Sequence, residues 1–253
     1  MKRVLTAIVA IPIVFAITVF APDWIFALVV GIVAAFAAEE FLALGQARGI
    51  GRPGRWFVVP VAVVAASFFG GAYWVVTTLS VSTLTLMSVC AFGGSMETTM
   101  PRTAVGLGAM AYCGLTLGFL VLFPREFVLV LFGIIWAGDT AAYYVGRLLG
   151  RHPLAPKISP HKTVEGAIAG LLGSVAAGII GGVFFLGEAW PDMALISVAT
   201  AAAGQVGDLV ESALKRSAGV KDSSSILPGH GGILDRLDSL FFAVPVFYWF
   251  FRT

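Results

Sequence analysis

The sequence predicts an all-α, polytopic integral membrane protein with about nine transmembrane helices. Hydrophobic residues make up 58% of the 253 positions and charged residues only 12%, and the mean hydropathy is +0.95. A soluble globular chain carries roughly 25% charged residues, so this chain cannot cover itself with polar side chains in water. The net charge of +2 identifies no partner, and we expect membrane lipids but no nucleic acid.

Nine apolar runs are suitable for membrane spans. A spanning helix needs about 20 mainly apolar residues, and the fourth and ninth runs are shorter. The first run follows Lys2 and Arg3 like a signal peptide, but a signal core has only about 7–15 residues, so we expect a retained helix. The runs are 4–20, 23–44, 56–77, 81–96, 104–123, 127–147, 164–186, 193–213 and 237–251.

The distribution of cations supports this topology. With the N-terminus inside, every Lys and Arg except Arg125 and Arg252 falls in an inside loop or at an inside helix end. Such a bias is the positive-inside rule. The topology predicts that both polar segments described below lie on the cytoplasmic side of the membrane. If the source is a prokaryote, we expect this to be the plasma (inner) membrane.

No repeat or long linker divides the chain, so we expect one membrane domain, 1–253. Residues 1–126 hold little candidate chemistry and are predicted to be a scaffold, whereas 127–253 are predicted to carry the catalytic helices and loops. Small-residue patterns at Gly166–Gly170 and Gly178–Gly182 would let helices approach closely.

The run 127–147 carries polar residues at helical spacing. Asp139, Tyr143 and Arg147 lie at i, i+4 and i+8 and would share one face. A carboxylate at membrane depth costs roughly 2.5–3.5 kcal/mol on insertion scales, so Asp139 needs a polar cavity or a partner. A purely structural pair of Asp139 with Arg147 or a tyrosine is the alternative.

The loop that follows is cationic and leads into the next helix. Lys162 and its basic neighbours precede Thr163, which would cap the helix, and Glu165 would lie in the first turn. Positive charge beside a helix N-terminus suits phosphate. The alternative is a topogenic loop that touches anionic lipid headgroups.

A second polar stripe ends the run 193–213. Asp208, Glu211, Ser212 and Lys215 lie at i, i+3, i+4 and i+7 and would share one face. An internal pair of Glu211 with Lys215 would account for two of them. Neither this pair nor helix packing explains why the apolar run contains a carboxylate at Asp208.

The segment 215–238 is the most polar part of the chain. Its Pro228-Gly-His230-Gly-Gly loop allows the backbone to approach a ligand closely. Asp235 and Asp238 would share a helical face, and carboxylates suit Mg²⁺, which is usually held together with substrate phosphates. Lysines and arginines in the segment would neutralise those phosphates. The pattern favours metal-assisted phosphoryl or nucleotidyl transfer.

The motif Ser212-x-Leu-Lys-Arg-x4-Lys-Asp-x5-Pro-Gly-His-Gly-Gly-x2-Asp-Arg-x-Asp238 resembles the signature of the phosphatidate cytidylyltransferase (CDP-diacylglycerol synthase) family. Two upstream blocks, around Asp139 and around 159–166, resemble further family blocks. The run Ser223-Ser224-Ser225 departs from more usual glycine-containing sequence. The resemblance covers about 135–240 in the family order.

The resemblance implies that CTP and phosphatidate react to give CDP-diacylglycerol and pyrophosphate. It implies a binuclear site of Mg²⁺ and a monovalent cation such as K⁺, with Asp208 and Asp235 as ligands; Asp139 is a further candidate ligand. A homodimer is a family-level expectation. Lys215 is assigned to catalysis with the two aspartates. Candidate phosphate contacts and other substrate-binding motif positions are Lys162, Ser212, Arg216, Lys221, Asp222, His230, Arg236 and Asp238.

Two other functions fit some of these features. A CTP-dependent lipid kinase acting on an isoprenoid alcohol would use similar groups but release CDP. A transporter would also contain intramembrane acids, but it would place them near the bilayer midplane and often show internal repeats. The crowding of the polar residues at one face argues against transport.

Overall fold

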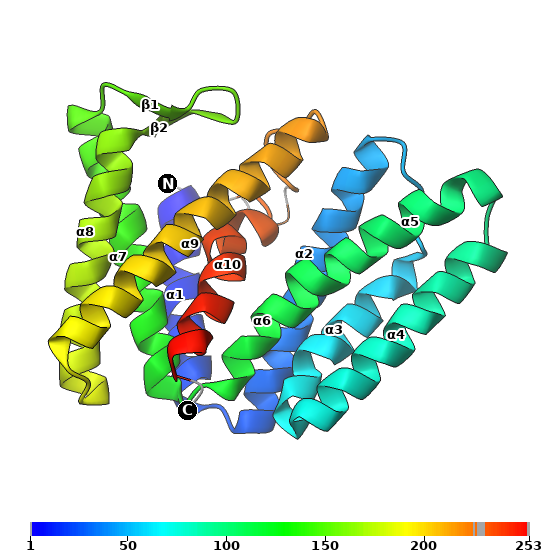
Figure 1. Cartoon of the computed structure of the whole chain (residues 1–253), viewed down its shortest axis with the longest axis horizontal. Helices are drawn as coiled ribbons and strands as arrows, with labels where there is room; N and C mark the ends of the chain where they lie inside the picture. Colours follow the sequence, from blue (N-terminus) through cyan, green and yellow to red (C-terminus); the bar gives the residue numbers. More distant parts are fainter. Residues whose placement is uncertain (1, 225, 227–230, 252–253) are drawn as a thin grey trace. The chain divides into compact units, whose positions relative to one another are not determined.

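The computed structural model describes residues 2–224, 226 and 231–251, with side chains from residue 11 onward. Most of the described chain is helical, which confirms the all-α prediction (Figure 1). The long helices are α1 (Lys2–Phe20), α2 (Asp23–Ala47), α3 (Val58–Ser67), α4 (Ala72–Phe92), α5 (Met96–Ala109), α7 (Arg125–Leu149), α8 (Val164–Gly181), α9 (Trp190–Ser217) and α10 (Leu234–Phe251). Shorter helical turns are η1 (Arg55–Phe57), η2 (Phe68–Gly70), η3 (Met110–Leu115), α6 (Thr116–Gly118), η4 (Phe119–Leu122) and η5 (Gly182–Leu186).

Each of the nine predicted runs corresponds to a helical segment of the described chain. Among the described residues, six helical segments are long and apolar enough to cross a membrane, which confirms a polytopic protein. The segments Ile11–Phe20 and Arg55–Gly70 are shorter, and α10 begins with three charged residues, Asp235, Arg236 and Asp238. The spans beyond these six stay predictions. The six are Asp23–Ala47, Ala72–Phe92, Met96–Leu122, Arg125–Leu149, Val164–Leu186 and Trp190–Ser217.

The predicted boundary between the third and fourth runs is wrong. The run 56–77 was expected to be continuous, but its helix ends at Gly70 and α4 begins at Ala72. Gly71 has a φ of 85°, a conformation that glycine adopts without steric penalty. The hydrophobic pattern continues through this break because both flanking helices are apolar.

The chain forms two compact units. The first comprises Met1–Leu122 and Leu214–Leu237, and the second comprises Phe123–Ala213 and Asp238–Thr253, so α9 and α10 contribute to both. In the first unit, α2 lies so close to α3 that a Cβ at Gly31 would be 2.8 Å from the carbonyl oxygen of Ala62. Small residues permit such close helix packing in membranes.

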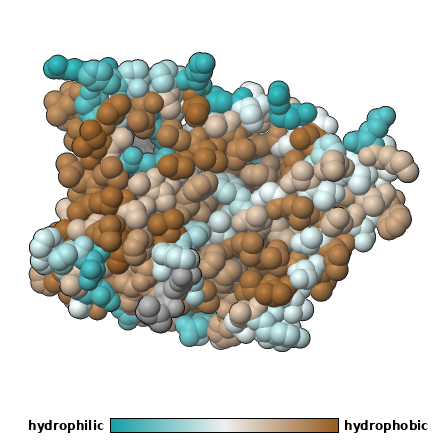
Figure 2. Space-filling view, viewed as in Figure 1, coloured by the Kyte–Doolittle hydropathy of each residue, from teal (hydrophilic) through white to brown (hydrophobic). Residues whose placement is uncertain are grey.

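In the second unit, glycines bring α7 and α8 together. A Cβ at Gly166 would lie 2.9 Å from the carbonyl oxygen of Ala142, and one at Gly170 would lie 3.2 Å from that of Gly138. The close approach predicted from the Gly166–Gly170 pattern is therefore confirmed. Ile168 and Leu172 are exposed apolar side chains of α8. Figure 2 shows a largely hydrophobic surface over the face that it draws.

A two-stranded antiparallel hairpin precedes α8 and was not predicted. Strand β1 (Pro153–Ala155) pairs with β2 (Ser159–Thr163). The carboxylate of Glu165 accepts hydrogen bonds from the backbone N–H groups of Arg151, at 3.1 Å, and His152, at 3.3 Å. These bonds tie the start of the hairpin to the first turn of α8. In Figure 2 hydrophilic residues gather over this hairpin.

The predicted helix cap at Thr163 is confirmed, because its Oγ1 accepts the N–H of Gly166 at 3.1 Å. Replacing Thr163 by alanine is expected to destabilise the protein by about 1 kcal/mol, since that N–H loses its acceptor. Thermal unfolding in detergent measures the effect. Thr163→Ser is the matched control because it retains the hydroxyl, and equal unfolding temperatures for the two variants would contradict the assigned cap.

Candidate active site

A cavity of about 550 Å³ lies in the second unit. Helices α7, α8, α9 and α10 and the hairpin supply its walls, and glycines of α7 and α8 are among the lining residues. Most of these helices are apolar, so the charged groups in the wall stand out. Its polar lining includes Asp139, Tyr143, Arg147, Lys162, Gln205 and Asp208.

The helical stripe predicted on α7 is confirmed. Asp139, Tyr143 and Arg147 all line the cavity, as their i, i+4 and i+8 spacing requires. The Nη1 of Arg147 donates a hydrogen bond to the Tyr143 hydroxyl at 3.2 Å. The stripe thus presents a carboxylate and a cation to the same space.

Lys162 and Asp208 form an ion pair in this cavity. Lys162 comes from β2, and its Nζ contacts Oδ2 of Asp208 on α9. Both side chains are only 28% exposed, so water screens their attraction less than at an open surface. In the structure, therefore, Lys162, a predicted phosphate contact, is paired with Asp208, a predicted metal ligand.

Further acidic groups gather near Asp208. The carboxylate of Asp238 experiences the negative charges of Asp208, Glu211 and Asp139. Glu211, the next acid of the predicted α9 stripe, is fully buried.

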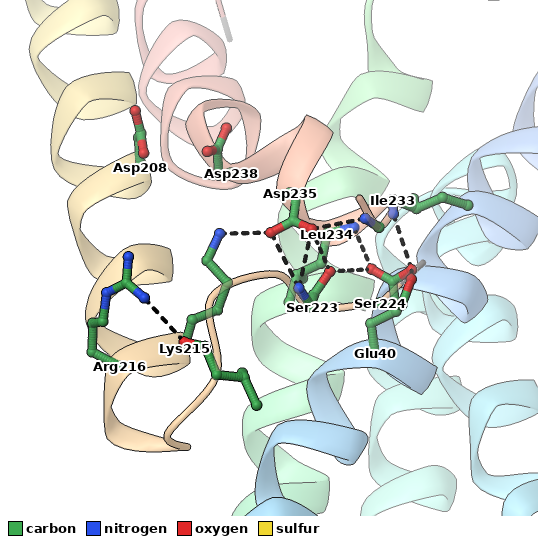
Figure 3. A network of polar contacts seen from close by, with 12 residues as sticks. Glu40, Asp208, Lys215, Arg216, Ser223, Ser224, Ile233, Leu234, Asp235 and Asp238 are labelled. Atoms are coloured by element: carbon green, nitrogen blue, oxygen red, sulfur yellow. Dashed lines mark hydrogen bonds and ion pairs between the residues drawn. The ribbon is translucent and has the colours of Figure 1, made fainter. Parts of the chain in front are cut away.

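Asp235 is the centre of a polar network in the first unit (Figure 3). Its Oδ1 accepts a hydrogen bond from Nζ of Lys215 at 2.6 Å, and the two side chains are 6% and 12% exposed. Its Oδ2 accepts the N–H of Gly232 at 2.7 Å and the N–H of Ser223 at 3.1 Å. The loop backbone thus closes around one carboxylate.

The ionised form of Asp235 is favoured. This residue precedes the predicted span 237–251. Burial raises the pKa of its carboxyl, but the hydrogen bonds from Lys215 and Gly232 and the charge of Lys215 lower it by more, so the net pKa lies below its ordinary value. An ionised carboxylate is the form that binds a metal ion.

Glu40 of α2 was missed by the sequence analysis, which found little candidate chemistry in the N-terminal half. It is 2% exposed and receives hydrogen bonds from the segment 223–234 (Figure 3). The available signal was its position in the apolar run 23–44, where an acid requires a partner. The partner lies more than 180 residues away, so no local pattern identifies it.

Most of the other predicted substrate-binding residues have side chains exposed to solvent. Arg216 is exposed, and its Nη1 donates to the carbonyl oxygen of Val220 at 3.3 Å. Lys221, Asp222 and Arg236 are exposed, and Ser212 is half-buried on α9. His230 and the preceding Pro228-Gly229 lie outside the described residues.

The carboxylates suit a hard metal ion. Among the described residues, no group of three or more His, Cys, Asp or Glu side chains is arranged to hold a metal. Mg²⁺ does not require such a group, because it is usually held by one or two carboxylates together with waters and substrate phosphates. In the second unit Asp208 and Asp139 offer the oxygen donors that this ion prefers, and in the first unit Asp235 offers them as well. Each of these carboxylates therefore suits Mg²⁺.

The whole chain, residues 1–253, matches the model of the cytidylyltransferase family. A phosphatidate cytidylyltransferase of Staphylococcus saprophyticus subsp. saprophyticus is 35% identical over 255 residues, with 96% of each chain covered. Proteins of the same name from Staphylococcus haemolyticus and Staphylococcus aureus are each 34% identical, over 256 and 255 residues, with the same coverage. These similarities confirm the resemblance found in the sequence motifs and extend it over both halves. The chain belongs to the cytidylyltransferase family.

Proposed function

We propose that this protein is a membrane-embedded phosphatidate cytidylyltransferase. It transfers the cytidylyl group of CTP to phosphatidate, giving CDP-diacylglycerol and pyrophosphate for phospholipid synthesis. The observation that carries the proposal is the 35% identity, over 96% of both chains, to a protein of that name. The paired acids and lysines of an otherwise apolar chain supply the chemistry that such a reaction needs.

Charge neutralisation is the main task of the side chains. A phosphate oxygen of the lipid attacks the α-phosphorus of CTP, a new P–O bond forms, and the bond to pyrophosphate breaks. The attacking group is already an anion, so the reaction requires alignment and electrostatic stabilisation more than a strong base. In this assignment Lys162 and Lys215 contact phosphates, together with the more exposed Arg216, Lys221 and Arg236.

The lysines are held in position by acids that we assign to the metal centre. Lys162 pairs with Asp208, and Lys215 pairs with Asp235. We assign the two aspartates as ligands of Mg²⁺ and Asp139 as a further ligand or a supporting residue, with K⁺ as a second cation. Held by these residues, Mg²⁺ would supply positive charge for the phosphates and the leaving pyrophosphate.

The proposed orientation follows from the loop charges. The N-terminus and the segments 148–163 and 214–236 are placed on the cytoplasmic side, where basic loops accumulate. CTP then approaches from the cytoplasm, and phosphatidate enters from the bilayer. A homodimer is part of the proposal on family grounds.

The products of the reaction test this function. Purified protein in detergent, incubated with α-labelled CTP, phosphatidate and Mg²⁺, is expected to form labelled CDP-diacylglycerol and unlabelled pyrophosphate. Diacylglycerol in place of phosphatidate is the matched control and should give no labelled lipid. Release of labelled CDP with an isoprenoid alcohol would instead identify a lipid kinase. Absence of CDP-diacylglycerol under every cation condition would rule out the proposal.

A further inference from the structure

Glu40 joins α2 to the segment that carries Asp235. Its Oε1 accepts hydrogen bonds from Ser224 Oγ at 2.6 Å and from the N–H of Ile233 at 3.0 Å. Its Oε2 accepts from Ser223 Oγ and from the N–H of Leu234, both at 2.7 Å. One buried carboxylate therefore fixes both ends of the loop that precedes α10 (Figure 3).

Ser223 connects Glu40 directly to Asp235. The Ser223 hydroxyl lies 2.7 Å from Oε2 of Glu40 and 3.0 Å from Oδ2 of Asp235, so its single proton lies between two carboxylates. The Ser223 N–H donates to Asp235 as well. On the other side, the N–H that Leu234 donates to Glu40 belongs to the residue immediately before Asp235. Any displacement of Glu40 therefore displaces the groups that orient Asp235.

We propose that Glu40 is a positioning residue that holds Asp235 in its metal-binding orientation through Ser223 and the Leu234 backbone. This inference rests on the proposed function for its catalytic consequence, since it requires Asp235 to be a metal ligand. It assigns a role in the reaction to the N-terminal half. Groups that hydrogen-bond a metal ligand typically change metal affinity or activity about 10- to 100-fold when they are removed.

The hydrogen bonds require a carboxylate at this position. Each oxygen of Glu40 receives one hydroxyl and one backbone N–H. A serine hydroxyl can turn to accept a bond, but a backbone N–H can only donate. Glutamine presents one oxygen and one NH₂ group, so either orientation of its amide directs a donor at the N–H of Ile233 or of Leu234.

The Glu40→Gln variant tests this inference. We expect its half-saturating Mg²⁺ concentration to rise about 10-fold or more and its kcat to fall. Amide exchange at Ile233 and Leu234 is expected to be about 10-fold faster, because both donors lose a charged acceptor. Glu39→Gln is the matched control: Glu39 is the preceding residue on α2, is more exposed, and pairs with Arg52 at 2.5 Å. It should leave all three quantities unchanged.

A merely structural role gives a different result. If Glu40 only stabilised the fold, Glu40→Gln would lower the unfolding temperature and the yield of active protein, but the remaining enzyme would keep its normal Mg²⁺ dependence. That result would overturn the inference. If Glu40→Gln does not fold, the pair Ser223→Ala and Ser224→Ala replaces it. Because Ser223 contacts both carboxylates, Ser223→Ala should raise the half-saturating Mg²⁺ concentration by more than Ser224→Ala does. Equal effects would overturn the inference.

The failure of this inference is distinguishable from the failure of the proposed function. An inactive wild-type protein would refute cytidylyl transfer, yet amide exchange with and without Mg²⁺ would still report on the loop. Mg²⁺ should then slow exchange at Gly232 and Ser223, the Asp235-bound amides, more strongly in the wild type than in Glu40→Gln. Identical exchange in the two proteins overturns the role of Glu40 whatever reaction the protein catalyses.

Discussion

Replacing Asp235 by asparagine is expected to lower kcat/KM for CDP-diacylglycerol formation by about 1000-fold, a loss typical of removing a group that stabilises charge in the transition state. The amide keeps the shape of the side chain but loses its charge. The Nζ of Lys215, at 2.6 Å, and the N–H groups of Gly232 and Ser223 lose a negatively charged acceptor. The measurement is steady-state formation of labelled CDP-diacylglycerol at saturating Mg²⁺.

Two comparisons make this prediction specific. Glu97→Gln changes an exposed acid of the first unit, outside the polar network, and should retain wild-type activity. Yield and unfolding temperature in detergent show whether Asp235→Asn is inserted and folded. A folded Asp235→Asn protein with near-normal kcat/KM would remove Asp235 from the metal centre.

Replacing Asp208 by asparagine is expected to cause a loss of similar size, about 1000-fold in kcat/KM. Asp208 lies in the cavity wall with Lys162 as its ion-pair partner. Two explanations of such a loss must be separated: Asp208 binds the metal, or it only holds Lys162 in place. A double-mutant cycle with Lys162→Met distinguishes them.

The two explanations predict different double mutants. If Asp208 acts on the metal, Asp208→Asn lowers kcat/KM strongly even in the Lys162→Met background. If it only orients Lys162, the double mutant is no worse than Lys162→Met alone, and the metal assignment is wrong. Asp192→Asn, an exposed acid in the first turn of the same helix, is the control and should have no effect.

Local hydrophobic patterns were sufficient to predict most of the fold. Apolar length identified the helical segments, and the spacing of Asp139, Tyr143 and Arg147 placed all three in one cavity wall. The break at Gly71 was missed because the hydropathy profile does not change there. Glycine adopts a positive φ with little conformational strain, so the helix can end without a polar residue. The hairpin was missed because its strands, of three and five residues, lie in a polar loop and lack a buried alternating face.

The site was predicted in part, and for a physical reason. Residues such as Asp208 and Asp235 lie within compact polar segments, so composition alone draws attention to them. Glu40 acts through a single long-range set of hydrogen bonds, and only the folded chain brings it to Ser223 and Leu234. A lone acid in an apolar helix therefore indicates a polar partner that lies elsewhere in the sequence.

The pairing of lysines with acids also bears on how the protein is made. An ionised aspartate that enters a bilayer alone costs several kcal/mol more than a neutral side chain. Lys162 supplies a counter-ion for Asp208, which lies in the predicted span 193–213, and Lys215 supplies one for the buried Asp235 just before the last predicted span. Each of these acids therefore has a positively charged partner within the chain itself, independent of any bound ion or substrate.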